Sequence, residues 1–184
     1  FRSSPYLVEG PFATIKNRSR PIDFRAPQIG IGNKPIDDGN YIFNRSEMNE
    51  FLDLCPEASQ FLKPYIGARE FLNNGQRWIL DLRLASESTI DDLPPIKNRV
   101  ELVREFRSKS KSPGTVRLAA SPRNFHVEFR PHGKYIAIPK TSGESREYIP
   151  AGVLTKDDVP SDAMLVLDTE DLLVLGILCS KMNN

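Results

Sequence analysis

The longest helical pattern of the chain runs from about residue 95 to residue 110. Apolar side chains recur there every three or four positions, which places them on one face of a helix, namely Ile96, Val100, Val103 and Phe106. Two prolines stand where the pattern begins, and proline is tolerated in the first turn because the amide hydrogens there have no partner within the helix. We therefore predict a helix over this stretch.

Two shorter helices are predicted on either side of the long one. Over residues 46–54, acidic residues fall near the first turn, where the helix dipole favours negative charge. Ser46 is the expected N-cap, and Pro56 ends this helix. The longest apolar run of the chain belongs to a last helix, which we predict over residues 170–181.

Strand signals are short and lie between residues that favour turns. Asn73-Asn74-Gly75 predicts a hairpin turn, and a turn with a positive φ angle is expected at Gly30, Gly32 or Gly39. After the long helix, strands are expected to return from Thr115 onward. The expected strands are residues 12–16, 41–43, 77–82, a strand around Val127, residues 135–138, a strand near Tyr148, and residues 163–167. The sequence therefore predicts an α+β fold, with short, mostly antiparallel strands in a twisted sheet, a long basic helix and a C-terminal helix.

The composition is that of an ordinary soluble globular protein, with 39% hydrophobic and 27% charged residues. We expect residues 1–184 to form a single domain. No apolar run is long enough to span a bilayer. Cys55 and Cys179 lie in apolar or helical surroundings, so a disulfide framework is not expected and a reducing cytoplasm fits best. The chain begins at Phe1 without a signal-peptide pattern, and both ends are interpreted as cuts in a longer protein.

Charge is distributed unevenly along the chain. Residues 97–146 hold 12 Lys or Arg against 4 Asp or Glu, a net charge of +8, while the remaining residues hold 13 against 20, a net charge of −7. Such asymmetry is expected of a protein that lays one side on a polyanion, although a cluster of basic residues on a solvated helix would look the same. The positive charges of the predicted long helix include Lys97, Arg104 and Lys111, which are seven residues apart, with Arg107 nearby.

The sequence shows no pattern typical of a catalytic or metal site. "GIGNKP" lacks the Gly-Lys-Ser/Thr ending of a phosphate loop and is followed by a strand pattern, whereas phosphate is held at a helix N-terminus. His126 and His132 have no cysteine at a spacing that suits zinc. Acid pairs beside prolines, as in "TIDDLPP", are better explained by helix starts and turns. We therefore predict no catalytic residue and no bound metal.

An acid and a base stand two residues apart in "YIAIPKTSGESREYIP", residues 135–150. If this segment is extended, Glu144 and Arg146 point to the same side. Arginine can donate two hydrogen bonds to guanine O6 and N7, and glutamate can accept one from cytosine N4. The pair could therefore read one G·C pair, and the alternative is a surface ion pair worth about 0–1 kcal/mol.

The stretch "SPRNFHVEFRPHGKYIAIPKTSGESREYIPAGVL" resembles the target recognition domain of MmeI-like restriction–modification enzymes. The pattern of that family is close to Pro-x-x-Phe-x-x-Glu, a Tyr-Ile strand, a Pro, and then Ser-Glu-x-Arg-x-Tyr-Ile-Pro-x-Gly. Matches continue in "YLVEGP", "GIGNKPIDDGNYIF", "PYIGAREFLNNGQRW", "RVELVREFRSKSKS" and "LGILCSKM". Gly143 stands where the family usually has Ser, and Lys140-Thr141 replaces the commoner Arg-Val.

The resemblance implies a domain that reads duplex DNA for an S-adenosylmethionine-dependent N6-adenine methyltransferase, in some members fused to an endonuclease. The methyl-donor loop and the Asn-Pro-Pro-Tyr motif of such enzymes are not in this chain, so the cofactor and the catalysis are expected in a methyltransferase domain of the same parent chain. Because that domain acts on a base, the target adenine is swung out of the duplex.

The residues expected to contact DNA fall into two groups. Lys97, Arg104, Arg107, Lys109 and Lys111 are expected to hold phosphates. Glu144 and Arg146 are expected to read base edges, with Arg123, Asn124, Arg130 and Lys140 as further candidates. The alternative hypothesis is a protein-interaction scaffold whose basic helix docks on an acidic partner.

Overall fold

The structure of the chain is a computed structural model that describes residue 17 and residues 27–180. The described helices are α1 (Arg45–Leu54), the 3₁₀ helix η1 (Pro56–Phe61), α2 (Ala68–Asn73), α3 (Glu87–Asp91), α4 (Pro94–Ser108), α5 (Pro113–Leu118) and α6 (Leu172–Leu178). The described strands are β1 (Gly30–Ile31), β2 (Ile42–Phe43), β3 (Leu62–Ile66), β4 (Trp78–Leu80), β5 (Tyr135–Pro139), β6 (Gly152–Leu154), β7 (Val159–Pro160) and β8 (Met164–Leu167). The strand predicted over residues 12–16 lies outside the described residues.

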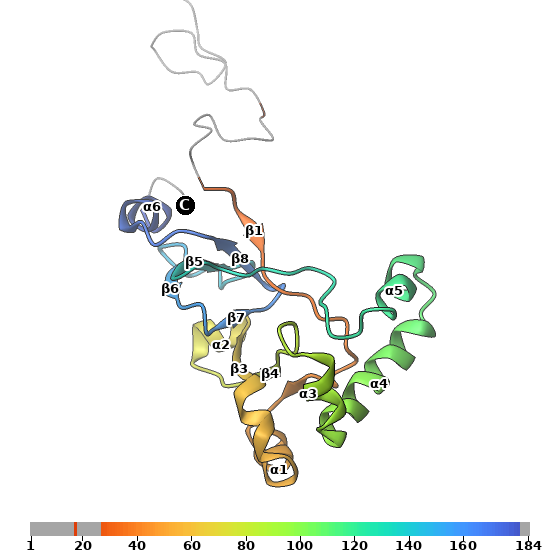
Figure 1. The fold of residues 1–184 in the computed structure, drawn as a ribbon. Helices are drawn as coiled ribbons and strands as arrows, with labels where there is room; N and C mark the ends of the chain where they lie inside the picture. The colour runs from red at the N-terminus through yellow and green to blue at the C-terminus, as the bar shows by residue number, and fades with distance from the viewer. Residues whose placement is uncertain (1–16, 18–26, 181–184) are drawn as a thin grey trace, which may run out of the picture.

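The first sheet combines strands from both ends of the described chain. Its order is β1–β8–β5–β6, and every neighbouring pair is antiparallel. The central strand β5 is buried along its whole length, because Tyr135 and Ala137 face a cluster that includes residues of α2, whereas Ile136 and Ile138 face α6. Helices α2 and α6 therefore cover opposite faces of this sheet (Figure 1).

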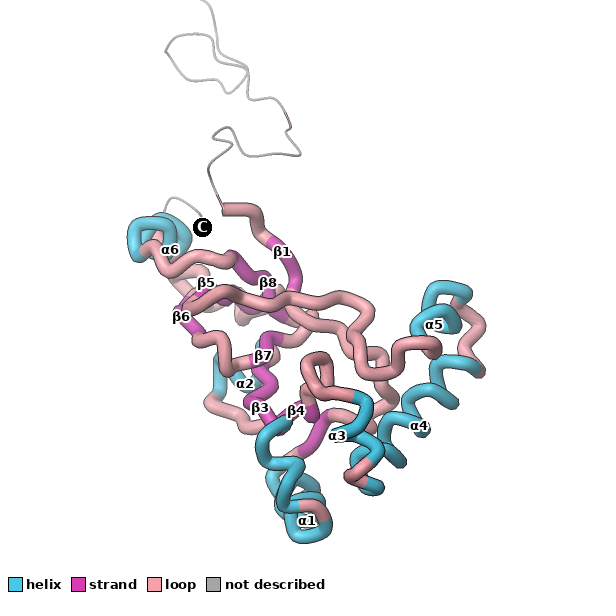
Figure 2. Tube along the Cα trace, viewed as in Figure 1, coloured by secondary structure: helices cyan, strands magenta, loops and turns pink. Residues whose placement is uncertain are grey.

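The second sheet has the order β2–β4–β3–β7, and only its β3–β7 pair is parallel. Figure 2 shows the strands of both sheets in the middle of the molecule and the helices toward its outside. The predicted α+β fold with mostly antiparallel strands is confirmed, but the strands are divided between two small sheets instead of forming one.

Backbone and side-chain hydrogen bonds of Asn33 join the two sheets. The Asn33 amide donates to the carbonyl oxygen of Pro160 at 2.7 Å, and its Nδ2 donates to the same oxygen at 3.1 Å. Its Oδ1 accepts from the amide of Phe129 at 2.9 Å. The side chain of Asn33 is fully buried, so these bonds satisfy polar atoms that water cannot reach.

Gly32, next to Asn33, lies against the backbone of the β7–β8 connection. A Cβ added at Gly32 would lie 2.1 Å from the carbonyl oxygen of Ser161. The positive φ angle expected at Gly30, Gly32 or Gly39 is confirmed at Gly39, where φ is 77°, and Gly30 and Gly32 do not adopt one. Glycine at position 32 is explained by this close approach of two backbones.

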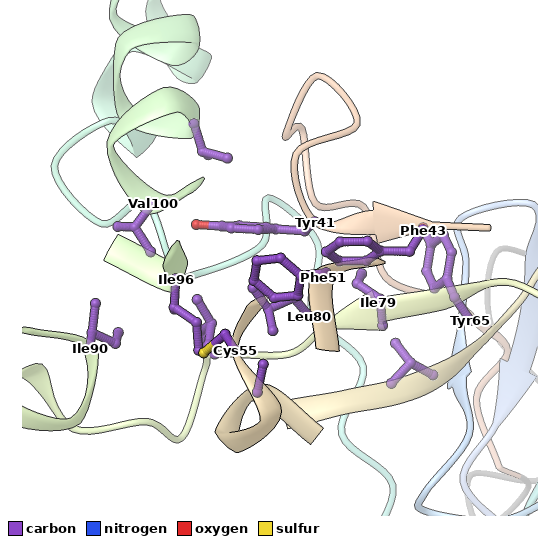
Figure 3. Close-up of a cluster of buried hydrophobic side chains, with 14 of the residues drawn as sticks. Tyr41, Phe43, Phe51, Cys55, Tyr65, Ile79, Leu80, Ile90, Ile96 and Val100 are labelled. Atoms are coloured by element: carbon purple, nitrogen blue, oxygen red, sulfur yellow. The ribbon is translucent and has the colours of Figure 1, made fainter. Parts of the chain in front are cut away.

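The main core lies between the second sheet and the helices α1, α3 and α4. Figure 3 shows Tyr41, which directly precedes β2, and Phe43 of β2 beside Phe51 of α1. The rings of Phe43 and Phe51 lie 5.2 Å apart between centroids. On the other side of the cluster, Ile96 and Val100 enter from α4 (Figure 3). Aromatic and branched side chains thus hold the long helix on the sheet.

Helix α4 confirms the predicted long helix to within two residues at each end. Ile96, Val100 and Val103 are buried as predicted. Phe106 is 37% exposed, however, and the fourth buried position belongs to Arg107. The spacing of the buried stripe was therefore right up to Val103, but the residue that continues it is charged.

Two helix starts differ from the prediction. The N-cap of α1 is Asn44, not Ser46: Asn44 Oδ1 accepts from the Glu47 amide at 3.0 Å, and Glu47 Oε2 accepts from the Asn44 amide at 2.8 Å. This reciprocal pair satisfies two amides that a single cap leaves open. Helix α1 ends before Pro56, as predicted. Helix α6 confirms the predicted C-terminal helix over a shorter range.

Four other predictions are wrong in detail. Asn74 has a φ angle of 53° and ends helix α2, so the Asn-Asn-Gly signal marks a helix end and not a hairpin. The chain after Thr115 continues as helix α5, which starts at Pro113. Val127 makes only an isolated bridge with Lys34, and the strand expected near Tyr148 is found instead at Gly152–Leu154.

Candidate nucleic-acid interface

The connection between β5 and β6 carries Glu144 and Arg146. Glu144 and Ser145 form a turn, and the Arg146 amide donates to the Gly143 carbonyl oxygen at 3.2 Å. Glu144 therefore lies in a turn that Arg146 directly follows, and the segment is not the extended strand in which both side chains would point to the same side. Residues 141–148 are all exposed. Within the part of the chain that the structure describes, no ion pair joins Glu144 to Arg146, so the surface ion pair considered as the alternative is absent.

Both ends of this connection are anchored. The Lys140 amide donates to the carbonyl oxygen of Ala163 at 2.9 Å, which extends the pairing of β5 with β8. At the other end, Ile149 and Ala151 pack on the side of the first sheet that α6 covers. The arrangement presents an exposed tip on a fixed base, as is common for loops that bind ligands.

The exposed cations of α4 and the segment after it are partly neutralised by acids. Three of these cations form ion pairs, namely Lys97 with Asp91 at 2.8 Å, Arg104 with Glu101 at 3.5 Å and Lys109 with Glu105 at 2.6 Å. The hydrogen bond from Lys97 to Asp91 and the charge of that acid raise the pKa of Lys97, and Lys109 lowers the pKa of Glu105 in the same way. Lys111 is exposed, and within the described residues no carboxylate pairs with it.

Arg107 is not available to a phosphate, which corrects the expectation for this residue. Its side chain is fully buried. The guanidinium donates to five backbone carbonyl oxygens at 2.7–3.1 Å, those of Pro35, Ile36, Leu118, Ser121 and Asn124. The residue ties the segment of Pro35 and Ile36, the end of α5 and the following loop to helix α4. Its role is therefore structural.

A groove of about 340 Å³ brings four of the expected contact residues together. It lies between α3, α4 and the loop after α5, and Lys97, Arg104, Arg123 and Asn124 line it. Arg123 is held in place, because its Nη1 donates to the carbonyl oxygen of Ala85 at 2.6 Å. Acids also line the groove, namely Glu87, Asp91 and Glu101. Fold topology thus gathers residues that are far apart in sequence, in a groove of mixed charge.

A second groove, of about 320 Å³, contains Arg130 together with residues that sequence reasoning missed. Lys63 and Lys156 line it with Arg130, and the exposed Leu84 lies at it as well. Arg130 pairs with Glu128, at 2.7 Å between Nη2 and Oε2. Lys63 and Lys156 lie outside the basic window of residues 97–146, so no local signal points to them. Only the pairing of β3 with β7 brings their segments together.

The expected single basic side is instead divided. Figure 1 shows α4 and α5 forming an arm on one side of the molecule, whereas the β5–β6 end of the first sheet lies on the other side, beside α6. The turn between β4 and α3 lies between them in this view. Glu144 and Arg146 therefore lie apart from the phosphate-holding candidates of the arm, whereas Arg123 and Asn124 share a groove with Lys97 and Arg104.

Other kinds of site find little support in the described residues. Within residues 27–180, no group of three or more His, Cys, Asp or Glu side chains is placed to hold a metal ion. Among the helices that the structure describes, none has the length and apolar character needed to cross a bilayer.

Comparison with known proteins gave matches to a protein family, to a curated relative and to a solved structure. The family described as "MmeI, target recognition domain" matches residues 9–184. A relative named DNA methyltransferase A, from Bacillus subtilis (strain 168), is 33% identical over 180 residues, which are 98% of this chain and 20% of the relative. A solved structure of the Type IIL restriction–modification enzyme MmeI in complex with DNA superposes with a TM-score of 0.86 at 35% identity, over 98% of this chain and 24% of that one. The chain thus spans about a fifth to a quarter of the length of these proteins.

Proposed function

The chain belongs to the MmeI target recognition domain family, and from this premise we propose that it reads the sequence of duplex DNA for a longer DNA methyltransferase. The observation that carries the proposal is the match over nearly the whole chain to an enzyme whose structure was solved with DNA. The TM-score of 0.86 at 35% identity supports a common fold of this chain and the matching part of that enzyme. Nothing in the structure favours a scaffold that docks on an acidic partner.

In this proposal, Glu144 and Arg146 read base edges in the major groove. Both side chains are exposed on a turn with a fixed base, so they can enter a groove without rearrangement of the sheet. A guanidinium suits guanine O6 and N7, and a carboxylate suits cytosine N4. Lys140, which precedes the exposed tip, is a further contact to guanine or phosphate.

Contacts to phosphate come from the arm. Lys97, Arg104, Lys109 and Lys111 are exposed there, and phosphate contacts of this kind fix orientation without reading sequence. Phosphates would compete with Asp91, Glu101 and Glu105 for three of these cations. Arg123 and Asn124 in the first groove, and Arg130 in the second, are placed for base or phosphate contacts.

Methyl transfer belongs to another part of the longer enzyme. The sequence of this chain contains neither the methyl-donor loop nor the Asn-Pro-Pro-Tyr motif. We infer that a methyltransferase domain in the same polypeptide holds that cofactor and modifies adenine N6. The domain described here would position the duplex so that the target base reaches that site.

The base-reading role is tested by Arg146→Ala in the longer enzyme. We expect a loss of about 1–3 kcal/mol in discrimination at one base position, because a bidentate contact to guanine is removed, with little change at other positions. The measurement is methylation of a duplex library in which each position of the site carries all four base pairs. The matched control is Arg104→Ala, which should weaken methylation evenly across the library.

Exchange of Glu144 and Arg146 for another pair of side chains should change which site is methylated while methylation continues. If Arg146→Ala leaves the preference at every position as in the wild type, Arg146 does not read a base. If the wild-type enzyme shows no preference among duplexes at all, the proposed function itself is wrong.

Phosphate contact by the arm predicts a change in salt dependence. Lys111→Ala should make the slope of log K against log salt concentration shallower by about 0.9, because one fewer counterion is released on binding. The measurement is fluorescence anisotropy of labelled duplex binding to the longer enzyme over a salt series. Arg45→Ala, on α1 and outside the proposed contacts, is the control and should leave the slope unchanged. Equal slopes for wild type and Lys111→Ala would remove Lys111 from the interface.

A further inference from the structure

Leu84 is the most exposed of the large hydrophobic side chains in the described residues, at 85% of its possible surface. It lies in the turn between β4 and α3, and Leu82, two residues earlier, is fully buried in the core. The Ala85 amide donates to the Leu82 carbonyl oxygen at 3.1 Å, which closes the turn. Leu84 therefore projects from the surface at the tip of a short, closed turn.

Buried contacts hold this turn from within. The side chain of Arg83 is only 6% exposed. It donates twice to the carboxylate of Asp81, at 2.7 Å from Nε and 2.7 Å from Nη2, and once to Asn33 Oδ1 at 2.8 Å. Its guanidinium also lies 4.4 Å from the centre of the Phe125 ring. The residue next to Leu84 is thus held by Asp81 of its own segment and by two distant segments of the chain.

A second arginine holds the other side of the turn. Arg123 Nη1 donates to the carbonyl oxygen of Ala85 at 2.6 Å. Both neighbours of Leu84 are therefore held in place. Arg83 is held through its own guanidinium, and Ala85 is held through its carbonyl group, which accepts from Arg123. An exposed leucine is common on protein surfaces, but a leucine held out on a turn with this many buried anchors is preorganised to contact something outside the described residues.

The groove beside Leu84 carries cations that have no strong partner. Lys63 and Lys156 line it, and within the described residues neither makes an ion pair. Three acids also line it. Burial alone would raise the pKa of Asp81, but the hydrogen bonds and charge of Arg83 hold it below its usual range, so this acid is already neutralised.

The other two acids leave the lysines accessible. Asp158 accepts hydrogen bonds from the amide and hydroxyl of Thr155, at 2.9 and 2.8 Å, so its carboxylate bonds to a residue of its own turn. Asp157 is exposed. The groove therefore offers two ammonium groups next to an apolar tip, which is the combination found where an apolar side chain enters stacked bases while cations hold the adjacent phosphates.

We propose that Leu84 is an apolar wedge that inserts between stacked bases of the bound duplex, with Lys63 and Lys156 on the neighbouring phosphates. The proposal rests on the proposed function and deepens it, because a base that must leave the stack for methylation leaves more easily next to a wedge. The position of the turn supports it, since Figure 1 places this turn between the β5–β6 end of the molecule and the α4–α5 arm.

The test uses the longer enzyme and duplexes that carry 2-aminopurine at each position of the site in turn. Wild type should raise the fluorescence of the probe at the step where bases unstack. Leu84→Ala should abolish most of that rise and slow methylation about tenfold, while the sequence preference stays that of the wild type. Leu84→Met keeps a long apolar side chain and should restore both the fluorescence rise and the rate.

Leu54→Ala is the matched control, because Leu54 is also exposed, at 70%, but lies at the end of α1. It should behave as the wild type. If Leu84→Ala shows the same fluorescence and rate as the wild type, the wedge is wrong while the proposed function stands. If Leu84→Ala instead lowers the melting temperature of the DNA-free enzyme, Leu84 packs against another domain and the wedge is again wrong. If the wild-type enzyme neither binds nor methylates DNA, both proposals fall.

Discussion

Replacement of Arg107 by alanine should lower the free energy of unfolding of the chain by about 3–5 kcal/mol, because several buried carbonyl oxygens lose their donor together and each unsatisfied buried group costs about 1–3 kcal/mol. Five carbonyl oxygens accept from this guanidinium at 2.7–3.1 Å. Burial lowers the pKa of Arg107, but an arginine starts so high that it remains charged in the folded protein.

The measurement is urea denaturation, and a loss of this size corresponds to a fall of about 10 °C in melting temperature for a chain of this length. Arg107→Lys should recover only part of the loss, because an ammonium cannot reach five acceptors in the planar arrangement that a guanidinium offers. The matched control is Arg104→Ala on the same helix, whose side chain is 52% exposed and whose loss should stay within about 0.5 kcal/mol. A loss below about 1 kcal/mol for Arg107→Ala would show that water replaces the guanidinium.

Gly32→Ala should be nearly as costly, with a loss of about 3 kcal/mol, because the added methyl group meets backbone atoms that cannot rotate away. It would lie 2.1 Å from the carbonyl oxygen of Ser161 and 2.7 Å from that of Pro160. To relieve this overlap, the backbone at Gly32 must move away from the backbone of Pro160 and Ser161. That movement would also stretch the hydrogen bond from the Asn33 amide to the Pro160 carbonyl oxygen. The expected consequence is a weaker connection between the two sheets.

Gly30→Ala is the control for this prediction, since it lies two residues away in β1. A Cβ at Gly30 would meet its nearest atom, a methyl group of Val166, at an ordinary 3.7 Å. Its effect on denaturant unfolding should remain within about 0.5 kcal/mol. Similar losses for the two alanine variants would mean that the general cost of altering a glycine, and not the contact with Ser161, determines the result.

Local patterns predicted the fold where a few neighbouring residues decide the structure. The long helix was found from its apolar spacing and its prolines, and β5 and β8 from short apolar runs. The same local reasoning misplaced Arg107. The buried face of the helix comprises positions 96, 100, 103 and 107, which are three or four residues apart. Phe106 was predicted as the fourth buried residue because it is apolar, whereas Arg107 is charged. No local pattern reveals that five carbonyl oxygens converge on that position.

In the candidate interface, too, some residues could be predicted from the sequence and others only from the folded structure. Glu144 and Arg146 could be chosen from their chemistry and from the family resemblance, and their exposure agrees with that choice. The turn at Glu144 and Ser145 was missed, because Ser-Gly-Glu-Ser is also compatible with an extended segment. Lys63, Leu84 and Lys156 lie on different elements that only the folded chain brings to one groove, so sequence reasoning could not group them.

The exposed tip between β5 and β6 also bears on how proteins of this kind diversify. Residues 141–148 are solvent-exposed, and the pairing of β5 with β8 does not depend on their side chains. Most substitutions there should therefore change folding stability by only a few tenths of a kcal/mol, roughly ±0.5 at most. Proteins with such a tip can therefore accept new side chains there without a prior increase in folding stability. Selection can then act on the ligand that these side chains recognise almost independently of its action on folding.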